Sequence, residues 1–162
     1  MVGAAKLRER ALAALETVTD PEIAVLTISD LGILRDVSVH DDTVRVTITP
    51  TYSGCPAMNM ITLDIETALA RAGIKARVNT RLSPAWTTDW LTDAARSKLA
   101  AFGIAPPERT ASRRALFGEA HPACPRCGSA DTELISEFGS TACKSLHRCR
   151  ACREPFDAFK CH

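Results

Sequence analysis

The sequence predicts an α+β fold, in which a small α-β-β-α-β sandwich domain precedes a zinc-ribbon-like module. Two observations lead to this prediction. In the first half of the chain, apolar residues recur at helical spacing in two segments and alternate as in β-strands in three others. Near the end of the chain, two Cys-x-x-Cys pairs are separated by 21 residues, which is typical of a metal ribbon with four thiolate ligands.

The sandwich domain is predicted over residues 1–82. Leucine and alanine residues at helical spacing predict a first helix at 4–17, and Pro21 disfavours its continuation. Alternating valines then predict a hairpin of two strands at 34–40 and 43–49.

A second helix is predicted after Cys55, because the apolar residues that follow share one helical face. These residues are Met58, Ile61, Ile65, Ala68 and Leu69. Gly73 is expected to end this helix, and residues 75–82 are predicted to form a third strand.

A helical extension is predicted over 83–107. It contains a single helix that Thr87 or Thr88 caps and that ends near Phe102. The polar, proline-containing stretch at 108–120 is expected to be a linker.

The ribbon is predicted over 121–162. Its four metal ligands are Cys124, Cys127, Cys149 and Cys152. A module this short, with few large apolar residues, needs the folding energy of a bound metal. Four thiolates suit zinc or an iron–sulfur centre, and both alternatives stay open. One tetrahedral site needs only four ligands, and the module also contains Cys143, Cys161 and His162. Each of these is an alternative ligand, a resolving thiol or a spare. His147 is expected at the solvated surface.

Cys55 lies in the sequence Ser-Gly-Cys-Pro, where the second helix is predicted to begin. Pro56 suits the first helical position, which would make Cys55 the N-cap. The helix dipole would then lower the pKa of the Cys55 thiol and favour a thiolate nucleophile or metal ligand. The alternative is that Cys55 is a small buried residue. Asp20 and Glu22, in the loop after the first helix, are the carboxylates expected to orient the thiolate or to join a metal site.

The composition limits the function classes. The 162 residues carry 20 basic and 19 acidic side chains, a balance that argues against nucleic acid or an anionic membrane as a partner. No apolar stretch reaches the roughly 18–20 residues of a membrane span, and the N-terminal segment lacks the apolar core of a secretory signal. Seven cysteines then favour metal binding or reactive thiols over disulfides, and we expect a cytoplasmic protein.

Two stretches, DPEIAVLTISDLGILRDV and VTITPTYSGCPAMNMI, resemble the small domain of iron–sulfur assembly factors of the SUF T type. With the segment SPAWTTDWLTDAARSKLAAFGIAPP and the cysteine-rich end, they resemble the phenylacetate-degradation D family, an accessory component of the bacterial ring-1,2-phenylacetyl-CoA epoxidase system. The resemblance covers nearly the whole chain. It places the motif cysteine of the family on Cys55 and its acidic loop on Asp20 and Glu22.

The resemblance implies an accessory role in phenylacetate catabolism. In that system a di-iron oxygenase oxidises the ring, and a reductase with flavin and a [2Fe–2S] centre supplies the electrons. The chain would mature or repair a metal centre, with Cys55 and Cys143 as transient cluster ligands and zinc held by the ribbon. The implied partners are the reductase or oxygenase subunits and cluster-assembly proteins; a homodimer through the helix that carries Trp86 and Trp90 is a further alternative.

The residues agree with an accessory role. The sequence shows no paired Glu-x-x-His motif of a di-iron protein, no Gly-rich dinucleotide loop and no plant-type ferredoxin cysteine run. We therefore expect a maturation factor without catalysis of its own rather than the oxygenase or the reductase. Two alternatives stay open: a thiol-dependent redox enzyme that uses Cys55, and a ribbon that only docks other proteins.

Overall fold

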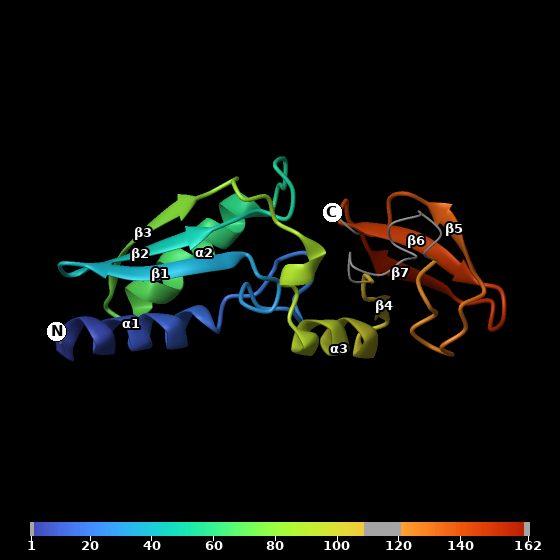
Figure 1. The fold of residues 1–162 in the computed structure, drawn as a ribbon, viewed down its shortest axis with the longest axis horizontal. Coiled ribbons are helices and arrows are strands. Elements are labelled where there is room, and N and C mark those ends of the chain that lie inside the picture. The colour runs from blue at the N-terminus through green and yellow to red at the C-terminus, as the bar shows by residue number, and fades with distance from the viewer. Residues whose placement is uncertain (1, 109–120, 161–162) are drawn as a thin grey trace. The chain divides into compact units, whose positions relative to one another are not determined.

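The computed structural model of the chain describes residues 2–108 and 121–160. The chain divides into two compact units, which we call unit 1 (Met1–Trp86) and unit 2 (Thr87–His162). Figure 1 labels the helices and strands of both units. No helix in the described ranges combines the length and the apolar character that a bilayer span requires.

Unit 1 contains two helices and a three-stranded sheet (Figure 1). In chain order its elements are α1 (Val2–Leu15), β1 (Leu34–His40), β2 (Thr43–Ile48), α2 (Met58–Arg71) and β3 (Lys75–Thr80). The central strand β2 is antiparallel to β1 and parallel to β3. The predicted α-β-β-α-β order is confirmed.

The core of unit 1 is built from one face of α2 and from the inward-facing residues of β2. The buried residues of α2 are Ile61, Ile65 and Leu69, which recur every four positions. Those of β2 include Val44, Val46 and Ile48, which alternate along the strand. Parallel strands need a crossover, and α2 provides it between β2 and β3. The loop that carries Cys55 therefore lies at the carboxyl end of β2.

Trp86 completes the packing of unit 1. Its side chain is buried, and its indole N–H donates a hydrogen bond of 2.7 Å to the backbone oxygen of Leu31. Trp86 follows the predicted sandwich domain and packs on it, as large aromatic residues usually do. Trp90 lies in unit 2 and is half-buried.

Unit 2 contains a short helical segment and a four-stranded sheet. In chain order its elements are η1 (Thr88–Trp90), α3 (Asp93–Ala101), β4 (Ile104–Ala105), β5 (Thr132–Ser136), β6 (Lys144–Cys149) and β7 (Pro155–Phe159). The strand order is β4-β7-β6-β5, and β4 runs parallel to β7 while the other pairs are antiparallel. The sheet thus joins residues 104–105 to the cysteine-rich end of the chain.

The single helix predicted from Thr87 or Thr88 to Phe102 is wrong. Thr87 caps the 3₁₀ turn η1, and the chain then becomes extended at Leu91. Thr92 caps α3, because its hydroxyl accepts a hydrogen bond from the Ala95 N–H at 3.0 Å. Two threonine caps in succession therefore divide the segment.

The core of the unit 2 sheet is small. One cluster consists of the buried residues Ala105, Cys124, Cys149, Phe156 and Ala158, and Ile104 and Phe159 are buried on the same strands. His147 is also buried, at 6% exposure, and its ring stacks on Phe156 across the β6–β7 pair. The expectation of a solvated His147 is therefore wrong. A core with so few apolar side chains gives little hydrophobic stabilisation, which leaves room for a metal to contribute.

Candidate functional site

The four cysteines of the ribbon converge on one point. The sulfur atoms of Cys124, Cys127, Cys149 and Cys152 all lie within 4.8 Å of one another. The Cys127 and Cys149 sulfurs are 3.5 Å apart, and those of Cys124 and Cys152 are 3.8 Å apart. A tetrahedral zinc site with Zn–S bonds of about 2.3 Å places its sulfurs about 3.8 Å apart. The residues present therefore fit a zinc ion.

The backbone holds each Cys-x-x-Cys turn in the same way. Gly128 follows the first pair and has φ of 75°, while Arg153 follows the second pair and has φ of 66°. Glycine suits this left-handed conformation, and the arginine adopts it in spite of its side chain. In the second turn, the Cys152 N–H also donates to the Cys149 sulfur at 3.4 Å. Both turns thus aim two sulfurs at the shared point.

The four thiols are not equivalent. Cys124 and Cys149 are buried, whereas Cys127 and Cys152 are exposed. The hydrogen bond from the Cys152 N–H lowers the pKa of Cys149 to about 7. The Glu154 N–H acts to lower the pKa of Cys152, but burial and the neighbouring thiols outweigh it and raise this pKa to about 12. The surroundings therefore favour a thiolate at Cys149 over one at Cys152.

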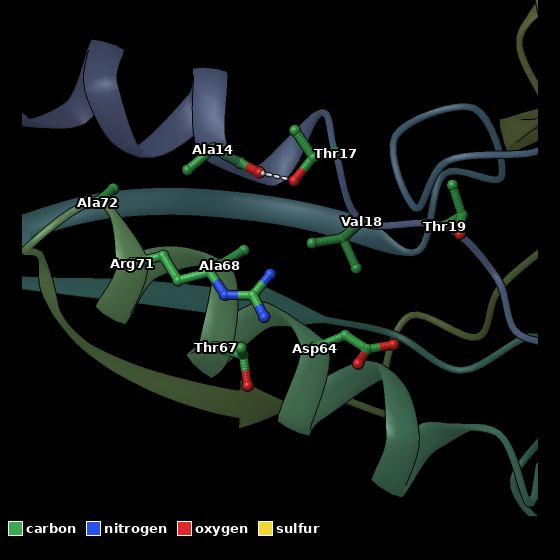
Figure 2. A pocket seen from close by; sticks show the side chains of 9 residues that line it. All are labelled: Ala14, Thr17, Val18, Thr19, Asp64, Thr67, Ala68, Arg71 and Ala72. Atoms are coloured by element: carbon green, nitrogen blue, oxygen red, sulfur yellow. Dashed lines mark hydrogen bonds between the residues drawn. The ribbon is translucent and has the colours of Figure 1, made fainter.

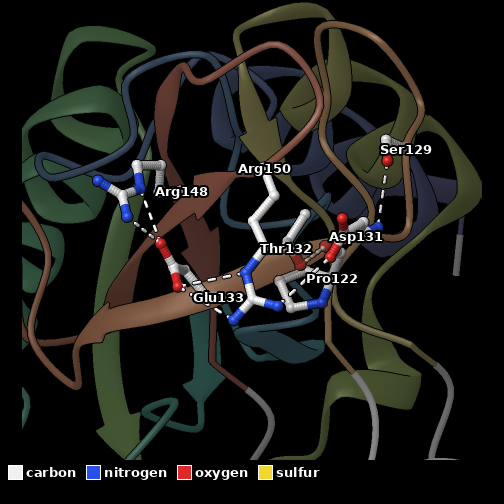
Figure 3. A network of polar contacts seen from close by, with 7 residues as sticks. All are labelled: Pro122, Ser129, Asp131, Thr132, Glu133, Arg148 and Arg150. Carbon is white, nitrogen blue, oxygen red and sulfur yellow. Dashed lines mark hydrogen bonds and ion pairs between the residues drawn. The ribbon is translucent and has the colours of Figure 1, made fainter.

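A network of ion pairs fastens β5 to the second cysteine turn. Glu133 on β5 accepts hydrogen bonds from Arg148 and Arg150, which flank Cys149 (Figure 3). These arginines hold the pKa of the Glu133 carboxyl below its ordinary value. Arg150 also lies 3.7 Å from the Asp131 carboxylate. These contacts hold the end of β6, which carries Cys149, next to β5.

Cys143 does not join the four-cysteine cluster. It directly precedes β6, whereas Cys149 ends that strand. At about 3.4 Å per residue, the five steps from Lys144 to Cys149 span about 17 Å. Cys143 is buried, and its sulfur lies 3.0 Å from the Thr141 hydroxyl. The terminal Cys161 and His162 lie outside the described residues.

Cys55 is not the N-cap that the sequence predicts. The helix α2 begins at Met58, and Ala57 occupies the cap position. Cys55 lies one turn earlier, where its N–H donates to the Tyr52 oxygen at 3.1 Å and its own oxygen accepts from the Met58 N–H at 3.4 Å. The sequence therefore places a tight turn between the strand and the helix. Cys55 is half-buried in this turn.

The predicted lowering of the Cys55 pKa is also wrong. Burial raises the pKa of this thiol, and the negative charges of Glu22 and Asp20 raise it further. Hydrogen bonds from the Ala57 N–H and the Thr51 side chain act in the opposite direction but do not prevail. The sequence does not single out Thr51. The only indication in the sequence that it contacts Cys55 is that it lies four residues before it.

The acidic loop and the Cys55 loop lie close enough in unit 1 for their charges to interact. Asp20 is buried, and its Oδ1 accepts hydrogen bonds from the N–H groups of Glu22 and Ile23 at 2.7 and 2.9 Å. These bonds fix the loop in an Asx turn. The charges of Glu22 and Asp20 thus act on the Cys55 thiol, and a shared site of these three residues stays a prediction.

A cavity of about 510 Å³ lies elsewhere in unit 1, between α1 and α2 (Figure 2). Mostly small side chains line it, and Figure 2 shows Arg71 and Asp64 on the α2 side. It contains none of the predicted site residues. The candidate functional site of unit 1 is therefore the loop that carries Cys55, and not this cavity.

Comparison with known proteins assigns a family to each part. Residues 8–80 match the family described as iron-sulfur cluster assembly protein, and residues 108–160 match the PaaD zinc beta ribbon domain. A protein of Escherichia coli strain K12, provisionally named as the D component of 1,2-phenylacetyl-CoA epoxidase, is 50% identical over 150 residues. The match covers 92% of this chain and 90% of that protein.

Two further relatives resemble the first half of the chain. The Fe-S protein maturation auxiliary factor YitW of Bacillus subtilis strain 168 is 35% identical over 88 residues, which is 54% of this chain and 83% of that protein. The crystal structure of a domain of unknown function, DUF59, from Bacillus anthracis matches with a TM-score of 0.56 and 26% identity. That match covers 60% of this chain and 95% of the other.

Proposed function

Because this chain belongs to the PaaD family and joins an iron–sulfur assembly domain to a zinc ribbon, we propose that it is an accessory protein of phenylacetate catabolism. Its role is to mature or repair the iron–sulfur or other metal centre of the phenylacetyl-CoA epoxidase system. Its partners are then the reductase or oxygenase subunits of that system and cluster-assembly proteins, and its place is the cytoplasm.

The observation that carries this proposal is the setting of Cys55. Burial raises the pKa of its thiol, and the negative charges of Glu22 and Asp20 raise it further, so the setting favours the protonated thiol when no metal is bound. When an iron–sulfur cluster or iron ion arrives as cargo, Cys55 loses its proton to solvent and binds the metal as a thiolate. Asp20 and Glu22 then face a cation and stabilise it. A ligand that is charged only while it holds metal suits a transient carrier.

The ribbon has a separate task in this proposal. Its four sulfurs form a closed all-thiolate set, which is typical of structural zinc. Zinc there supplies the folding energy that the small core lacks and gives unit 2 a rigid surface for partner proteins. Cys143 lies away from these sulfurs and is kept as a second transfer thiol in our proposal.

A redox or nucleophilic enzyme that uses Cys55 is the less favoured alternative. A catalytic thiol needs a lowered pKa, usually from a neighbouring cation or a helix N-terminus. At Cys55, burial and two carboxylates act against the thiolate. The setting therefore favours a metal ligand.

The test is the cluster content of the epoxidase-system reductase in cells that carry a Cys55→Ser variant. We expect the reductase to lose iron and acid-labile sulfide while the variant keeps its zinc. Ser53→Ala, at an exposed position of the same loop, is the matched control and is expected to leave the clusters intact. Normal cluster content with Cys55→Ser would refute the transfer role.

A further inference from the structure

Unit 2 contains a cavity that the proposed function does not use. Its volume is about 500 Å³, within the roughly 300–1,000 Å³ typical of small-molecule sites. The end of α3, the strand β4, the loop at 138–140 and the strands β6 and β7 surround it. None of the six cysteines in the described residues lines it.

A lysine whose side chain is largely buried lines this cavity. Lys144 is only 5% exposed, and its Nζ lies 4.0 Å from Oδ2 of Asp157. Within the described ranges, no closer polar contact is found for this Nζ. An ammonium group has three donors, and a contact of 4.0 Å is too long to satisfy any of them as a hydrogen bond. Lys144 therefore has hydrogen-bonding capacity left for a ligand.

Asp157 is already engaged by the loop beside it. Its Oδ2 accepts a hydrogen bond of 2.6 Å from the Ser140 hydroxyl, and its Oδ1 accepts one of 3.3 Å from the Ser140 N–H. A Cβ on Gly139 would lie 2.3 Å from Oδ1, so the absence of a side chain there lets the loop close on the carboxylate. The loop thus provides hydrogen-bond donors for the Asp157 carboxylate, whereas the Lys144 ammonium has only the ion pair with Asp157.

The surroundings of the cavity are apolar and positive. The rings of Phe102 and Phe138 line it and are 63% and 64% exposed. The ammonium of Lys160 lies 4.1 Å from the centroid of the Phe138 ring. Lys144 is thus the cation among the lining residues, Lys160 lies beside one of the lining rings, and a negatively charged ligand suits both.

We propose that this cavity binds a small organic acid. The carboxylate of the ligand pairs with Lys144, and its apolar or aromatic body packs against Phe102 and Phe138. The proposal does not depend on the role of Cys55, because the cavity and the Cys55 loop belong to different units.

The test is a calorimetric titration of the zinc-loaded full chain with sodium benzoate and with its neutral analogue benzamide. We expect benzoate to bind at least tenfold more tightly than benzamide, since only benzoate pairs with Lys144. Lys144→Met should weaken benzoate binding at least tenfold. Lys75→Met, which removes an exposed lysine of unit 1, should leave it unchanged.

A second variant tests the same cavity in case Lys144→Met does not fold. Phe138→Ala changes an exposed ring and should weaken the binding of benzoate several-fold while the zinc content stays normal. The proposal is wrong if benzoate does not bind, if benzamide binds equally well, or if a folded Lys144→Met chain binds benzoate like the wild type.

Discussion

The sulfur of Cys127 lies 3.5 Å from the sulfur of Cys149, although the two residues are 22 positions apart in the chain. Cys127 belongs to the turn before β5, and Cys149 ends β6. Their approach joins the two turns of the ribbon next to the small buried cluster of the unit 2 sheet. A zinc ion bound there would link segments that are distant in the sequence and so stabilise the fold of unit 2.

Removal of zinc by a chelator should unfold unit 2 and leave unit 1 folded, because the four-cysteine group found in the described residues lies in unit 2. The chain has two tryptophans, Trp86 in unit 1 and Trp90 in unit 2. In a Trp90→Phe variant, the fluorescence of Trp86 should not change on chelation. In a Trp86→Phe variant, the emission of Trp90 should move to longer wavelength. A change of both signals, or of neither, would contradict this prediction.

Cys149→Ser should abolish stoichiometric zinc binding, because the closed tetrahedral set then lacks one of its two buried thiolates. Cys143→Ser is the matched control, since Cys143 is also buried and precedes the same strand. Metal analysis of the purified variants should find zinc in the control and little in Cys149→Ser. Loss of zinc from both variants would show that Cys143 takes part in the site.

The Cys55 thiol should react slowly with iodoacetamide at pH 8, because its raised pKa keeps the thiolate fraction small. Glu22→Gln removes a negative charge, lowers the pKa and should therefore increase the alkylation rate at this pH. Glu66→Gln, on the exposed surface of α2, should not. Mass spectrometry of the Cys55 peptide gives the rate. Equal rates for both variants would mean that Glu22 does not act on the thiol.

Ile65→Ala should lower the free energy of unfolding of unit 1 by about 2–5 kcal/mol, because it leaves a cavity in a fully buried position. Leu63→Ala is the control on the same helix, where the side chain is 56% exposed and the loss should be at most about 0.5 kcal/mol. Urea unfolding followed by Trp86 fluorescence, in the Trp90→Phe background, measures both. Similar losses would contradict the packing of α2.

The sequence predicts the parts of this structure that local patterns determine. The stripe of Ile61, Ile65 and Leu69 and the alternating valines of β2 specify helix and strand through their periods alone. The four ribbon cysteines are recognisable because Cys-x-x-Cys turns carry the geometry of the site with them. These features need no knowledge of distant contacts.

The features that the sequence does not predict depend on contacts between distant residues, or on which of several possible N-cap residues starts a helix. The raised pKa of Cys55 comes from its burial and from Glu22 and Asp20, which are more than 30 positions away. His147 is buried because β7 brings Phe156 beside it. In the segment after Trp86, Thr87 caps the short turn η1, and Thr92, which the sequence pattern does not single out, caps α3.

Whether Cys55 holds a cluster is tested most directly by the metal content of anaerobically reconstituted wild type, Cys55→Ser and Ser53→Ala chains. We expect zinc in all three, with iron and acid-labile sulfide in the wild type and in Ser53→Ala but not in Cys55→Ser. Iron and sulfide that persist in Cys55→Ser, or that are absent from the wild type, would contradict the claim that Cys55 carries a cluster.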